Sequence, residues 1–97
     1  MTKADIVNKI AEATGLTKVE TEAVVNGFIS IIRDTLIQGE GIEIRGFGTF
    51  KIRKKNPRVA RNPRTGEKIY IPKKFVPYFK PSRDFKILVD NSRKIDS

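Results

Sequence analysis

The residues whose chemistry is clearest are the cations between Lys51 and Lys80. Eleven Lys and Arg side chains lie in this stretch, and Glu67 is its single carboxylate, so the stretch has a net charge of +10, whereas the whole chain carries +9. A solvated surface of ordinary composition mixes both signs of charge, so we predict that these cations contact the phosphates of a polyanion. They are Lys51, Arg53, Lys54, Lys55, Arg58, Arg61, Arg64, Lys68, Lys73, Lys74 and Lys80.

The same stretch has the sequence of a long β-hairpin. Asn, Pro and Gly favour a tight turn, and they cluster in Asn62–Gly66. Residues 68–71 then alternate between polar and apolar in the period of a strand. Pro57 and Pro72 lie on the two limbs, and proline is tolerated in a strand whose edge faces solvent. We therefore predict an arm over about residues 54–74 that stands free of the body.

The residue types exclude most chemistry other than binding. The chain has no Cys and no His, which removes disulfides, thiolate or imidazole metal sites and His-assisted nucleophiles. No pair of acids falls in a pattern typical of a catalytic cleft. We expect no enzyme activity, no catalytic residue, no metal or other cofactor and no small-molecule substrate. The sequence also lacks the apolar core of a signal peptide and any membrane-spanning run, so we expect a cytoplasmic protein without a membrane partner.

Two helices are expected before the arm. Thr2 and Gly15 have the residue types of an N-terminal and a C-terminal helix cap. The sequence Thr17-Lys18-Val19-Glu20 is a capping box, and it predicts a second helix to about Gln38. This second helix is apolar over much of its circumference, which requires cover on more than one side. Because a body this small is marginal alone, we expect a second copy of the chain to supply that cover.

A small sheet and a third helix complete the expected domain, which spans residues 1–97. Ile42–Arg45 and Thr49–Arg53 alternate as two strands around the turn Gly46-Phe47-Gly48, and Phe75–Lys80 returns from the arm as a third strand. Ser82 has the residue type of a cap for the last helix, and a polar, frayed tail is expected over residues 91–97. The side chains expected in the core are Phe47, Phe50, Phe75, Phe79, Phe85, Leu88 and Val89. The fold class is therefore α+β.

Two motifs give the chain a resemblance to a known family. They are Gly46-Phe47-Gly48-Thr49-Phe50 and Arg61-Asn62-Pro63-Arg64-Thr65-Gly66-Glu67. Their residues, separation and element order resemble those of the bacterial HU and integration host factor family of DNA-bending proteins, over Met1 to about Asn91. The chain departs from the family pattern at Ala60 and at Pro81-Ser82, where glycine is usual. The resemblance implies an intertwined dimer whose two arms wrap the minor groove of duplex DNA.

The resemblance also implies roles for individual residues. Pro63 matches the proline that intercalates between base steps, and Asn62 beside it is expected to contact minor-groove acceptors. Lys80, Arg83 and Lys86 match cations of the body that hold the flanking DNA after it has bent. The complete set of expected DNA-binding residues is Arg53, Lys55, Arg58, Arg61, Asn62, Pro63, Arg64, Lys68, Lys73, Lys74, Lys80, Arg83 and Lys86.

The function expected first is an architectural one. A homodimer would bind duplex DNA through the minor groove, kink it and compact or organise the chromosome as a nucleoid-associated protein. A heterodimer with a paralogue is the alternative assembly. The alternative function is a site-specific protein, similar to integration host factor, that assists recombination, replication or transcription. A basic RNA-binding protein is the remote alternative.

Overall fold

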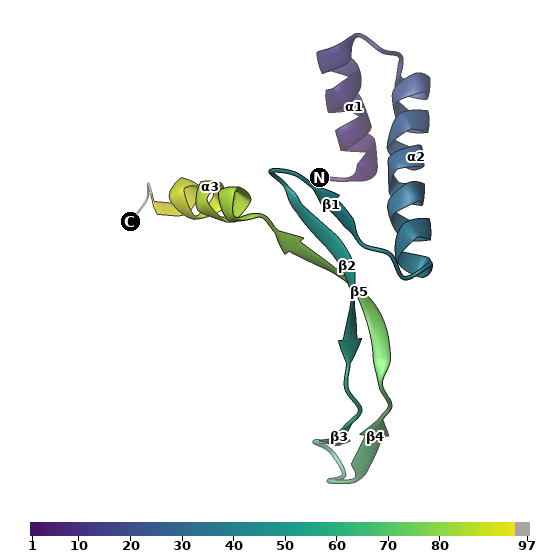
Figure 1. The fold of residues 1–97 in the computed structure, drawn as a ribbon, viewed down its shortest axis with the longest axis vertical. Helices are drawn as coiled ribbons and strands as arrows, with labels where there is room; N and C mark the ends of the chain where they lie inside the picture. Colours follow the sequence, from purple (N-terminus) through teal and green to yellow (C-terminus); the bar gives the residue numbers. More distant parts are fainter. Residues whose placement is uncertain (95–97) are drawn as a thin grey trace. The chain divides into compact units, whose positions relative to one another are not determined.

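The computed structural model describes residues 1–94 and confirms the α+β class and the expected order of elements (Figure 1). The chain divides into two units, one formed by residues 1–35 and one that begins at Leu36. The elements are α1 (Lys3–Thr14), α2 (Lys18–Ile37), β1 (Ile42–Ile44), β2 (Gly48–Lys55), β3 (Arg58–Arg61), β4 (Lys68–Ile71), β5 (Lys74–Pro81) and α3 (Arg83–Arg93).

Local side-chain hydrogen bonds set the ends of the first two helices. At the start of α1, the Asp5 amide donates to Thr2 Oγ1 over 3.3 Å, and the Thr2 amide donates to Asp5 Oδ2 over 2.8 Å. Gly15 ends α1 with a φ of 77°, in the left-handed region that glycine adopts without strain. The Glu20 amide donates to Thr17 Oγ1 over 3.1 Å at the start of α2. These caps lie where the sequence predicts them.

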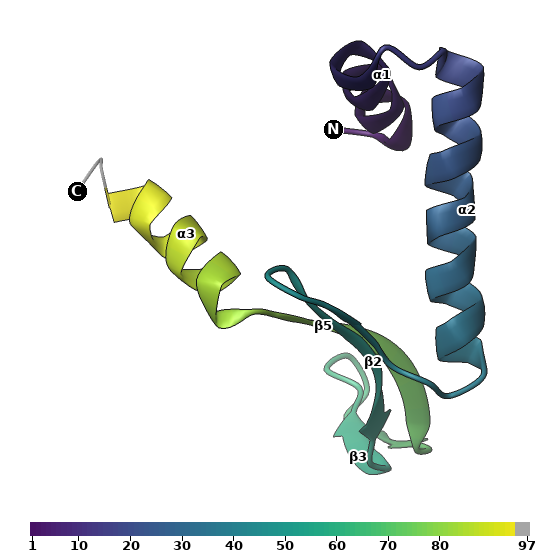
Figure 2. The same ribbon diagram turned by 45° about the horizontal axis from the view of Figure 1, so that its top comes forward.

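The two helices lie side by side and bury little between them (Figures 1 and 2). Val7 and Ala11 of α1 are buried, together with Thr21 of α2. In contrast, Val24 and Phe28 of α2 remain 65% and 54% exposed, which agrees with the expectation that one chain does not cover this helix. Within residues 1–94, no helix combines the length and the apolar character needed to cross a bilayer.

The second unit contains a three-stranded antiparallel sheet in the order β1-β2-β5. Ile42, Phe50 and Phe79 are cross-strand neighbours, and so are the residues of the next row, Glu43, Thr49 and Lys80. Because adjacent rows of a sheet face opposite sides, one face of this sheet is apolar and the other is polar. The sheet thus separates the packing surface of the unit from the surface that carries charge.

An aromatic cluster in this unit is formed by the rings of Phe47, Phe50, Phe79 and Phe85. The centroid of the Phe47 ring lies 5.0 Å from that of Phe79 and 5.2 Å from that of Phe85, and the Phe50 and Phe79 centroids are 4.8 Å apart. Ser82 connects α3 to the sheet turn, because its amide donates to the Phe47 carbonyl over 2.9 Å. The aromatic cluster therefore joins the start of α3 to the sheet.

Four of the apolar side chains expected in the core are exposed in this single chain. Phe47 of the aromatic cluster is 42% exposed. Phe75 is 60% exposed, and Leu88 and Val89 are 68% and 50% exposed. Phe75 pairs with Lys54 in the part of the ribbon beyond β1, where no third strand adds cover. Leu88 and Val89 lie beyond Phe85, the α3 residue that contacts the aromatic cluster.

Helix α3 continues into the segment that the sequence predicts to be a frayed tail. Residues 91–93 are helical, and two contacts stabilise this end: the Ser92 hydroxyl donates to the Val89 carbonyl over 2.7 Å, and Lys94 Nζ lies 2.9 Å from Asp90 Oδ2. The remainder of the predicted tail, residues 95–97, lies outside the described residues.

The two glycines beside Phe47 have different structural roles. Gly46 has a φ of 83° and open space around the position of a Cβ, so it serves the turn. Gly48 is the first residue of β2, and a Cβ there would lie 2.6 Å from the Lys80 carbonyl oxygen and 2.6 Å from Phe79 Cζ. Gly48 therefore provides the space that the Phe79 ring and strand β5 occupy.

This difference yields a prediction about stability. We expect Gly48→Ala to lower the free energy of unfolding by about 1–3 kcal/mol, because backbone and ring must shift to admit the methyl group. The matched variant Gly46→Asn should stay close to the wild type, because Asn tolerates a left-handed φ. Urea denaturation at one fixed protein concentration measures both. Equal stability of the Gly48→Ala variant and the wild type would contradict the packing role.

Candidate nucleic-acid interface

The predicted arm is a two-stranded ribbon with one interruption (Figure 1). The β2–β5 ladder extends to the pair Lys55 and Lys74, and the β3–β4 ladder begins at the pair Arg58 and Ile71. The register is the same on both sides of the interruption, so Pro57 falls opposite Pro72. Neither proline has an amide hydrogen, which explains why the ladder breaks here without a shift in register.

The tip of the arm is closed by hydrogen bonds that centre on Asn62. Its amide donates to the Glu67 carbonyl and its carbonyl accepts from the Gly66 amide, both over 2.8 Å. Its side-chain Oδ1 accepts from the Arg64 amide over 2.9 Å, which is an Asx turn. Gly66 supports the turn with a φ of 74°. Asn62 is thus a turn-forming residue whose side-chain NH₂ group is still able to donate to a ligand.

Pro63 is the first residue of this turn and its ring is exposed. The hydrogen bonds of Asn62 to Arg64, Gly66 and Glu67 close the turn that carries this ring. A proline ring is apolar and its nitrogen carries no hydrogen, so it can enter an apolar space without leaving a donor unpaired. This geometry is compatible with insertion of the Pro63 ring as a wedge between two base pairs, as the resemblance implies.

The cations of the arm are exposed and have no acidic partners in the described chain. Every expected DNA-binding Lys and Arg between Arg53 and Lys74 is exposed, and none of them forms an ion pair within residues 1–94. Arg53 is held in a different way, with its guanidinium 4.1 Å from the centroid of the Tyr78 ring. The charge of the arm is therefore available to an external polyanion.

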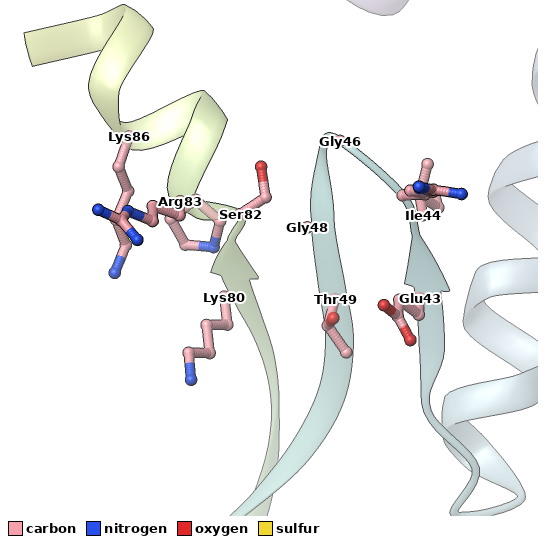
Figure 3. Close-up of a pocket in the computed structure, with 11 residues that line it drawn as sticks. Glu43, Ile44, Gly46, Gly48, Thr49, Lys80, Ser82, Arg83 and Lys86 are labelled. Atoms are coloured by element: carbon pink, nitrogen blue, oxygen red, sulfur yellow. The ribbon is translucent and has the colours of Figure 1, made fainter.

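A second group of cations lies at the end of the sheet, beside the start of α3. Lys80, Arg83 and Lys86 line a cavity of about 450 Å³, opposite Glu43 and Thr49 of β1 and β2 (Figure 3). The structure thus brings together the three body cations that the sequence singles out. They are exposed, and Ser82 caps the adjoining helix by accepting from the Phe85 amide over 3.1 Å.

Arg45 also lines this cavity, and sequence reasoning missed it. Arg45 is interspersed with acids in the sequence, which favours the interpretation of a solvated surface residue. Arg45 is identified only from its position in the fold, because the turn after β1 brings it to the same end of the sheet as Pro81 and Ser82. The cavity therefore has four cations and one carboxylate, that of Glu43.

The chain is similar to known DNA-binding proteins. A family model described as bacterial DNA-binding protein matches residues 1–90. Integration host factor subunit beta of Nitrosomonas eutropha is 41% identical over 95 residues, which cover 97% of this chain and 90% of that protein. The corresponding subunit of Vibrio cholerae is 42% identical over 87 residues, which cover 89% of this chain and 95% of that protein.

A solved structure is also similar. The protein chain of an Anabaena HU–DNA cocrystal structure superposes with a TM-score of 0.85 at 34% sequence identity, and the match covers 92% of this chain and 97% of that one. The likeness thus extends over both the sequence and the fold. The chain belongs to the HU and integration host factor family of bacterial DNA-binding proteins, whose members are architectural proteins and not enzymes.

Proposed function

We propose that this chain is a nucleoid-associated protein that binds the minor groove of duplex DNA with its arm and bends the duplex at defined sites. The observation that carries this proposal is the exposed, unpaired charge of a ribbon whose tip presents Pro63. The sequence alone favours general compaction of the chromosome. The relatives named integration host factor subunit beta favour the site-specific alternative.

The energetics of such a complex follow from the two groups of cations. Contacts between the arm and phosphates release counterions, which drives association without regard to sequence. Insertion of Pro63 between two base pairs costs a few kcal/mol of stacking. The bend that results brings flanking phosphates toward the cavity lined by Lys80, Arg83 and Lys86, and these contacts offset the cost.

Site preference in this mechanism arises mainly from deformability. The minor groove displays nearly the same acceptors for A·T and T·A pairs, so an arm that lies there reads little sequence directly. A wedge at Pro63 favours flexible pyrimidine–purine steps, because these unstack at lower cost. The NH₂ group of Asn62 adds one donor beside that step.

The binding unit is proposed to contain two chains. Apolar side chains of α2 such as Val24, Phe28 and Ile31 are more than half exposed, and burial against a second α2 would remove them from water. The sequence favours an identical copy as the second chain. The beta-subunit names of the relatives support a related second chain as the other candidate.

General compaction is the second candidate function. The likeness to a chain solved as HU in complex with DNA favours it. Selection of bound fragments from a pool of random duplexes separates the two functions. The chain is tested alone and together with any related family chain of the same genome.

We expect the selection to yield one consensus site, bound at least about 10³-fold more tightly than random duplexes of equal length. The preference should persist at physiological salt, because deformation energy, unlike phosphate attraction, is weakly screened. A selected pool without a consensus would reject the site-specific proposal and support general compaction instead.

Pro63 is the residue proposed to insert between base pairs as a wedge. We expect Pro63→Ala to reduce the bend strongly while duplex affinity falls less than about tenfold, because the cations of the arm remain. Pro57→Ala is the matched control, because it replaces a proline of the same ribbon away from the tip and should leave the bend unchanged. Energy transfer between dyes on the two duplex ends measures the bend. If Pro63→Ala bends DNA as the wild type does, Pro63 is not the wedge.

A further inference from the structure

Tyr70 is an exposed aromatic residue whose presence the fold does not explain. Its side chain is 69% exposed, and its cross-strand partner Val59 is 63% exposed. Its hydroxyl forms no hydrogen bond with residues 1–94. The other tyrosine of the chain, Tyr78, is half-buried and stacks under the Arg53 guanidinium. One tyrosine therefore has a partner within the described chain and the other does not.

A purely structural role accounts for only part of this arrangement. A cross-strand pair of an aromatic and a β-branched residue stabilises a ladder by about 0.2–1 kcal/mol. Such a contact uses one edge of the ring, whereas most of the Tyr70 ring faces solvent. Tyrosine has an apolar ring and a polar hydroxyl, and it is enriched at binding surfaces where one end of the side chain is buried and the other contacts water.

The cations that share a ribbon face with Tyr70 indicate what kind of ligand its ring contacts. Residues two positions apart in a strand share a face, so Arg61 follows Val59 and Lys68 precedes Tyr70 on this face. Arg61 and Lys68 are themselves a cross-strand pair, and both are exposed. An apolar pair next to two cations without carboxylate partners is complementary to nucleic-acid backbone, which alternates deoxyribose with phosphate.

We propose that Tyr70, supported by Val59, is a second apolar contact between the arm and duplex DNA. This proposal rests on the proposed binding of the arm in the minor groove. The ring packs on deoxyribose and its hydroxyl donates to a minor-groove acceptor, while Arg61 and Lys68 hold the adjoining phosphates. Val59 lies four residues before Pro63, or about 13 Å along a strand. The contact therefore falls roughly four base steps from the wedge.

Tyrosine fluorescence reports this contact directly, because the chain has two tyrosines and no tryptophan. In a Tyr78→Phe background, the emission belongs to Tyr70 alone. We expect saturating duplex DNA to quench this emission, and to change the emission of the converse Tyr70→Phe variant much less. Unchanged Tyr70 emission in a saturated complex overturns the proposal.

Affinity gives the second measurement. We expect Tyr70→Ser to weaken duplex binding at least about fivefold, and Tyr70→Phe to restore most of that loss. The matched control is Ile69→Ser, which removes an exposed apolar side chain of the same strand from the opposite face. Wild-type affinity of Tyr70→Ser, or an equal loss in both serine variants, overturns the proposal. Failure of the wild-type chain to bind duplex would instead reject the proposed function.

Discussion

Uncompensated charge on a two-stranded ribbon is the constraint on which the rest of this structure depends. A two-stranded ribbon has no interior in which Lys or Arg side chains could pair with acidic side chains. The one acidic residue of the stretch, Glu67, lies at the tip and forms no ion pair with these cations within residues 1–94. Like charges on such a surface repel one another, which favours an extended ribbon. Packing therefore has to come from elsewhere in the chain.

The sheet supplies this packing by dividing its two faces. Ile42, Phe50 and Phe79 lie on the apolar face, and the position of the Phe79 ring requires Gly48 beneath it. Strands β2 and β5 then leave the sheet as the ribbon, in one register from the body to the tip. The opposed prolines interrupt the ladder without changing that register. The register set in the sheet therefore continues along the ribbon to the turn that carries Pro63.

Features set by neighbouring residues could be predicted from the sequence. The caps at Thr2, Gly15 and Ser82 and the turn at Asn62–Gly66 depend on contacts within a few positions, and the structure confirms them. Burial of Phe75 and Leu88 could not be predicted, because it depends on which elements cover them. Arg45 was missed for a similar reason, since its place beside Lys80 and Arg83 exists only after three strands pair.

The salt dependence of duplex affinity tests most directly whether free cations of the arm drive binding. If six to ten phosphates are engaged, affinity should fall by roughly 10³- to 10⁵-fold between 50 and 200 mM salt. The double variant Arg61→Gln with Lys68→Gln should lower the slope of log affinity against log salt by about two. An affinity that is insensitive to salt, or a slope that the double variant leaves unchanged, would contradict this account.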